Sequence, residues 1–63
     1  MPEDSLEFLG RHIRAERVRC NLTQQELADR AELTKGYISQ LERGQVAPSV
    51  VTLLDLILSL IYI

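Results

Sequence analysis

Two helix starts only eleven residues apart constrain this chain more than any other feature of its sequence. Thr23 and Glu26 form a T-x-x-E capping box, in which each side chain accepts a backbone N–H at the start of a helix. Thr34 then offers a second N-cap. The spacing therefore predicts two short helices, over about residues 24–31 and 35–43, joined by a tight turn.

The apolar residues of these two helices predict which sides are buried. The first helix has a narrow apolar side made mostly of small residues, and small residues let a second helix come close. The second helix places Ile38 and Leu41 inward, so its polar residues face out. We expect the outward set to be Lys35, Gly36, Ser39, Gln40 and Arg43.

Helical patterns also flank this pair. Leu6, Leu9 and Ile13 recur at helical spacing, which predicts a helix over about 6–20 with Asp4 as its cap. Pro48 interrupts the chain before a last helix over about 50–61. We therefore predict an all-α fold, a compact domain of four helices that spans residues 1–63.

The C-terminal segment is far more apolar than one packed side requires. Eleven of its fourteen residues from position 50 are apolar, whereas one-sided packing needs about three positions in seven. Fourteen residues are too few to span a bilayer, which takes roughly 20. We expect a homodimer interface here, carried by Leu54, Leu58 and Ile61. Two alternatives stay open: a further domain covers this surface, or residues 57–63 form a β-strand.

Composition excludes several classes of protein. A chain of 63 residues with one Cys and one His has no paired metal ligands, no disulfide and no catalytic constellation. We expect no enzyme activity, no metal and no cofactor. The acidic start, MPED, is unlike a secretory signal, and the lone Cys20 fits a reducing compartment, so we expect a cytoplasmic protein.

The distribution of charge is more informative than its total. The net charge is −2, but all seven basic residues lie within residues 11–43, together with five of the nine acids. That span therefore carries a net +2. Local charge of this sign beside a polar helix face is compatible with a nucleic-acid partner.

Three segments, LGRHIRAER, NLTQQELADRAELTKGYISQLERG and PSVVTLLDLI, resemble the Cro and phage-repressor type of helix-turn-helix. These are the lambda-repressor-like (XRE) DNA-binding domains of bacterial and phage regulators. The resemblance implies sequence-specific binding of a double-stranded DNA operator in transcriptional regulation, with the helix over 35–43 in the major groove. It also implies a protein associated with the nucleoid, for which we expect a repressor, although the sequence leaves an activator open.

The resemblance assigns roles to individual residues. It places Lys35, Gly36, Ser39 and Gln40 at base edges, and Gln40 suits adenine because its amide donates and accepts together. It places Gln24, Thr34, Tyr37 and Arg43 at phosphates, although Tyr37 packing on the last helix is an equal alternative. It also implies that Gln24 braces the recognition helix. It also pairs Arg17 with Glu42 in a partly buried, structural salt bridge between the helix over 6–20 and the helix over 35–43.

Two departures from the family pattern stand out. Glu32 occupies a turn position that is often glycine, so a residue with a Cβ must adopt a strained or altered turn. The fifth helix that usually follows the fourth is absent, or the sequence is a fragment of a longer regulator. The alternative function, from another class, is a protein-interaction module, antitoxin-like or adaptor-like, built on the same scaffold.

Overall fold

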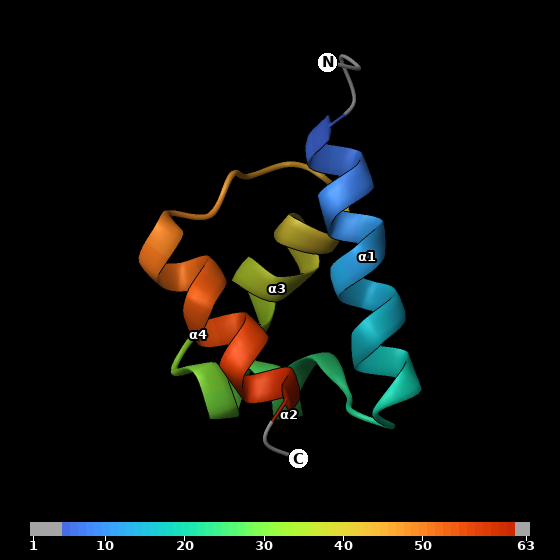
Figure 1. Ribbon diagram of the computed structural model, residues 1–63, viewed down its shortest axis with the longest axis vertical. Helices are drawn as coiled ribbons and strands as arrows, with labels where there is room; N and C mark the ends of the chain where they lie inside the picture. The colour runs from blue at the N-terminus through green and yellow to red at the C-terminus, as the bar shows by residue number, and fades with distance from the viewer. Residues whose placement is uncertain (1–4, 62–63) are drawn as a thin grey trace.

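The computed structural model describes residues 5–61, which form four helices (Figure 1). They are α1 (Ser5–Arg19), α2 (Gln24–Ala31), α3 (Lys35–Glu42) and α4 (Val50–Ile61). The described residues contain no strand, so the all-α prediction is confirmed. The strand alternative for 57–63 is wrong up to Ile61, and its last two residues lie outside the described range, as does Asp4.

The capping residues start the helices where the sequence placed them. The Thr23 side chain accepts the N–H of Glu26 at 3.0 Å, and the Glu26 carboxylate accepts the N–H of Thr23 at 2.8 Å. The Thr34 hydroxyl accepts the N–H of Tyr37 at 3.1 Å. Ser49 caps α4 in the same way, because its hydroxyl accepts the N–H of Thr52 at 3.1 Å. Each start is therefore fixed by contacts within three residues.

The turn between α2 and α3 contains a residue in the left-handed conformation, Glu32, which ends α2. Glu32 has φ 58° and ψ 42°, which is uncommon for a residue with a Cβ. The N–H of Leu33 returns to the carbonyl of Ala28 at 2.8 Å and closes the turn. The glutamate therefore takes the conformation that glycine would adopt freely, as the sequence led us to expect.

A small core lies where the helices meet. Leu27, Ala28 and Ile38 are completely buried, and Leu41 and Leu56 are almost so. Helix α2 packs against both α3 and α4, while α1 packs against α3. In Figure 1, α1 and α4 run down the two sides of the molecule and α2 closes the lower end. The core thus holds α3 in place through its buried residues Ile38 and Leu41.

Gly10 allows the closest approach between helices. A Cβ built on Gly10 would lie 2.5 Å from the carbonyl oxygen of Leu41 and 2.6 Å from that of Glu42. Both oxygens belong to the backbone of α3, so neither can rotate away. The glycine therefore sets the distance between α1 and α3, which explains its place inside a helix despite its low helix propensity.

Candidate nucleic-acid interface

The outward side of α3 is polar and open to solvent. Lys35, Gly36 and Gln40 are exposed and Ser39 is half-buried. At 100° per residue these four positions fall within an arc of about 140°. The opposite side of the helix carries Ile38, Leu41 and Glu42, which are all buried. Nothing lies within 4 Å of a Cβ built on Gly36, so another molecule can approach the backbone there.

A buried ion pair holds α3 from the inner side. The Arg17 Nε donates to Glu42 Oε2 at 2.6 Å, and its Nη2 donates to Oε1 at 3.1 Å. The two residues are only 9% and 7% exposed. Arg17 Nη1 also donates to the backbone carbonyl of Leu22 at 2.8 Å. A single guanidinium group therefore ties α1, the α1–α2 loop and α3 together, as a buried charge requires.

Gln24, placed at a phosphate by the resemblance, has part of its side chain occupied within the protein. Its Nε2 donates to Glu42 Oε1 at 3.1 Å, from the first residue of α2. The Glu42 carboxylate thus receives hydrogen bonds from both Arg17 and Gln24. This arrangement connects the start of α2 to the end of α3, and it leaves the amide oxygen and one amide hydrogen of Gln24 outside the hydrogen bond to Glu42.

The residue Gly44, just after α3, lies close against Glu7 in the first turn of α1. Gly44 has φ +74°, and a Cβ built on it would lie 2.8 Å from the Cα of Glu7. Arg43, the C-cap residue, is exposed, and its Nε donates to the Ser39 carbonyl at 3.3 Å. This bond keeps the Arg43 guanidinium along the outward side of α3. Helix α3 ends at Glu42, one residue before the predicted end.

Thr34 and Tyr37 occupy the N-terminal end of α3. Thr34 is exposed at the N-cap, where its hydroxyl already accepts a backbone N–H. Tyr37 is half-buried and packs against the core, so at least part of its side chain has a packing role. The remaining candidates, Lys35 and Arg43, have no acidic partner within salt-bridge distance among residues 5–61. Their positive charges are therefore available to an anionic ligand.

The carboxylates with shifted pKa values lie away from this face. The backbone N–H of Thr23 lowers the pKa of Glu26 most, followed by the Thr23 side chain. A hydrogen bond from Arg19, reinforced by its positive charge, lowers the pKa of Glu16. Both glutamates are exposed, and both shifts favour the charged form. Neither group is placed to transfer a proton to a ligand on α3.

Other kinds of site find little support in the described part of the chain. Residues 5–61 contain no group of three His, Cys, Asp or Glu side chains that is able to hold a metal ion. Within the same range, no helix combines the length and the apolar character needed to cross a bilayer. Cys20 is half-buried, and its Sγ lies 3.8 Å from the carbonyl oxygen of Leu60 at the end of α4.

The Leu22 carbonyl could not be predicted from the sequence as a partner of Arg17, and the family resemblance gave Gln24 a bracing role without naming Glu42 as its partner. The carbonyl of Leu22 and the amide of Gln24 join the ion pair through contacts that span 5 and 18 residues. The only sequence signal is a charged residue on an inward stripe, which requires partners but does not name them. Their identity depends on how α1, α2 and α3 cross.

Comparison with known proteins agrees with this arrangement. A helix-turn-helix family model matches residues 13–60. An uncharacterized HTH-type transcriptional regulator, y4dL, of Sinorhizobium fredii is 39% identical over 49 residues. The match covers 78% of this chain but only 25% of that regulator, so the chain spans about a quarter of its length.

A solved structure gives the same result at the level of the fold. The crystal structure of the clp gene regulator ClgR from C. glutamicum superposes with a TM-score of 0.85 at 32% identity. The superposition covers 94% of this chain and 74% of that one. Both matched proteins are named as regulators and neither as an enzyme. The chain therefore belongs to the helix-turn-helix family, of the XRE type found in transcriptional regulators.

Proposed function

We propose that this chain binds double-stranded DNA in a sequence-specific manner, with α3 in the major groove, as part of transcriptional regulation. The observation that carries the proposal is the polar side of α3, which is open to solvent. The buried Arg17–Glu42 pair fixes the position of this helix against α1. A recognition helix must present its side chains in a fixed register, and this ion pair and the core supply that rigidity. The DNA that the chain binds would be bacterial or phage DNA, and the binding would take place in the cytoplasm.

The roles that we propose for individual residues come from the family resemblance, and the exposure of the outward side of α3 supports them. Gln40 is exposed and reads adenine through a paired donor and acceptor. Lys35 and Ser39 reach neighbouring base edges, and Gly36 admits the groove wall close to the backbone. Contacts to phosphates come from residues at the start of α2 and at the two ends of α3. These are Gln24, Thr34, Tyr37 and Arg43, with Gln24 also bonded to Glu42.

Selection of bound sequences from a pool of random duplexes tests this proposal. We expect one enriched motif, and affinity that falls steeply as salt rises from about 50 to 200 mM, because each neutralised phosphate releases counterions. The selection is repeated at both salt concentrations. Enrichment of no motif, or affinity that does not depend on salt, would contradict sequence-specific binding.

We also propose that the protein acts as a homodimer through α4. Six apolar residues of α4 are exposed and fall within an arc of about 120° on one side of the helix. They include the three predicted interface residues, Leu54, Leu58 and Ile61, with Val50, Val51 and Ile57. Each of these Leu and Ile side chains is already about half covered in the monomer, so covering the remainder stabilises the assembly by roughly 1 kcal/mol per residue. A symmetric dimer also suits a palindromic operator, whose two half-sites lie about 34 Å apart.

The same apolar side of α4 favours a second candidate, a protein-interaction module. In that case the occupant is a different protein, and the polar side of α3 serves only solubility. The two candidates differ in one measurable respect. An interaction module gives no enriched duplex in the selection, whereas the proposed regulator gives one.

A further inference from the structure

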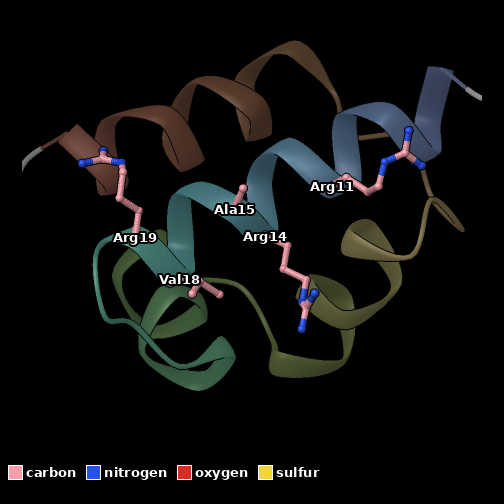
Figure 2. A pocket seen from close by; sticks show the side chains of 5 residues that line it. All are labelled: Arg11, Arg14, Ala15, Val18 and Arg19. Carbon is pink, nitrogen blue, oxygen red and sulfur yellow. The ribbon is translucent and has the colours of Figure 1, made fainter.

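The outer side of α1 carries a basic surface that the residues assigned above leave out. Figure 2 shows a shallow depression on this helix, lined by Arg11, Arg14, Ala15, Val18 and Arg19. All five residues are exposed. Because every one of them comes from α1, the depression is a feature of the surface rather than a pocket between helices.

The three arginines differ in whether their charge is neutralised. Arg19 Nη2 donates to Glu16 Oε1 at 2.7 Å, and its Nε donates to the same oxygen at 3.1 Å. Within residues 5–61, no carboxylate lies within salt-bridge distance of Arg11 or Arg14. Two uncompensated positive charges therefore remain on this side of α1.

The position of Arg14 brings it next to α3. It lies four residues after Gly10 and three before Arg17, so all three are neighbours on the helix surface. Gly10 meets the α3 backbone at Leu41, and Arg17 pairs with Glu42. Since Arg14 is bracketed by these two contacts and still exposed, it lies at the outer edge of the α1–α3 junction.

The direction of the side chains separates Arg14 from Arg11. In Figure 2 the guanidinium of Arg14 extends from α1 toward α3, whereas that of Arg11 extends toward the beginning of α1. The half of α3 that meets α1 is the one whose outward side carries Arg43. Arg14 and Arg43 are therefore both exposed arginines near the place where α1 meets the end of α3.

We propose that Arg14 contacts a phosphate of the DNA that α3 enters, so that α1 contributes to the DNA-binding surface. The inference rests on the proposed function. The major groove is about 12 Å wide and a helix with its side chains is about 10–12 Å across. A helix in the groove is therefore flanked by phosphate strands on both sides, and the element packed along its edge meets one of them. An arginine at that edge is suited to hydrogen-bond a phosphate.

The test compares Arg14→Gln with Arg11→Gln on the duplex enriched by the selection. We expect Arg14→Gln to weaken binding roughly five- to tenfold near 0.1 M salt on every sequence, without changing base preference. The slope of log affinity against log salt should fall by about 0.9, the value of one phosphate contact. Arg11→Gln removes the same charge from the same helix at an equally exposed position, so it controls for the general electrostatic field.

Each outcome bears on the proposal separately from the proposed function. A smaller change of slope in Arg11→Gln than in Arg14→Gln supports the contact. Equal changes in both variants would overturn it, since they report only the long-range field. Normal binding by the wild-type protein together with an unchanged slope in Arg14→Gln would overturn this inference alone. Absence of salt-dependent binding by the wild type would overturn the proposed function and this inference together.

Discussion

Arg17 shows how a single residue connects the core of this protein to its outer face. Its guanidinium donates hydrogen bonds to the Glu42 carboxylate on α3 and to the carbonyl of Leu22. The side-chain amide of Gln24, on α2, donates a further hydrogen bond to the same carboxylate. A buried ion pair adds little net stability compared with a well-packed apolar pair, but loss of one partner leaves a buried charge. The pair therefore specifies where α3 lies more than it stabilises the fold.

Replacing either partner alone should strongly destabilise the domain. We expect Arg17→Met and Glu42→Met each to lower the free energy of unfolding by about 3–5 kcal/mol. The double variant should lose less than the sum, because neither charge is then stranded. Urea denaturation of all four proteins measures the coupling. The exposed pair Arg19 and Glu16 serves as a control, and the same cycle there should show little coupling. Additive losses at Arg17 and Glu42 would argue against the pairing.

The two glycines in helices should respond to alanine in opposite directions. At Gly10 the new Cβ meets backbone oxygens of α3, so we expect a loss of about 1–3 kcal/mol in the free energy of unfolding. At Gly36 the Cβ enters open space, and the higher helix propensity of alanine should stabilise by up to about 1 kcal/mol. Thermal or urea unfolding of both variants decides the matter. A Gly10→Ala variant that is as stable as the wild type, or more stable, would show that α1 and α3 are less closely packed.

Gln40 and Arg43 should affect DNA binding in different ways. We expect Gln40→Ala to lose on the order of 1–3 kcal/mol on the best duplex and to relax the preference at one base pair. Arg43→Ala should weaken binding to all duplexes about equally, since a phosphate carries no sequence information. Repeating the selection with each variant measures both effects. A Gln40→Ala protein that enriches the unchanged motif would remove Gln40 from base reading.

At the scale of elements, α2 and α3 are each only eight residues long. Helices of this length are marginal by themselves, so local capping and tertiary packing must both contribute. The capping box at Thr23 satisfies two backbone N–H groups, and a carboxylate near a helix N-terminus also interacts favourably with the helix dipole. The stability of α2 should therefore depend on the charge of Glu26.

Protonation of Glu26 should destabilise the domain at acidic pH. Its folded-state pKa lies below the ordinary value of 4.5, chiefly because its carboxylate accepts the N–H of Thr23. The unfolded state therefore binds the proton more tightly, and the stabilisation is present above pH 4.5 and is lost as pH falls through the folded-state pKa. We expect Glu26→Gln to show a flatter decline of the urea midpoint between about pH 6 and 3. Identical pH profiles would contradict this role.

The whole molecule presents two chemically different surfaces on one small core. The polar side of α3 and the basic edge of α1 suit an anionic partner, whereas α4 exposes apolar residues along one side. Only Leu56 of α4 is fully buried, with Leu53 and Leu60 packed against the core at its side. Packing within one chain therefore uses three of the nine apolar residues of this helix. The proposed dimer would cover the other six.

An aspartate on α4 should dissociate the proposed dimer. We expect sedimentation velocity at micromolar concentration to show a dimer for the wild type and a monomer for Leu54→Asp. Val18→Asp is the matched control, because Val18 on α1 is 54% exposed and Leu54 is 53% exposed. A folded, monomeric wild type would refute the interface. A dimer that survives Leu54→Asp but not Val18→Asp would place the interface on α1.

The sequence by itself determined where the two central helices begin and which sides of them are buried. Thr23, Glu26 and Thr34 act on backbone groups no more than three residues away, so their effect is readable without the fold. The alternation of Ile38 and Leu41 with polar residues likewise follows from helix periodicity alone. The family resemblance, which the comparisons confirm, rests on these same local features.

Only the tertiary structure decided how the helices meet. The amide of Gln24 bonds to Glu42, 18 residues away, and Gly10 lies against the α3 backbone near Leu41. The place of Arg14 at the edge of α3 was equally invisible, because in sequence it is one exposed arginine among several. Contacts of this kind depend on the crossing angles and separations of packed helices. Those quantities are set by the whole core at once, and no local pattern contains them.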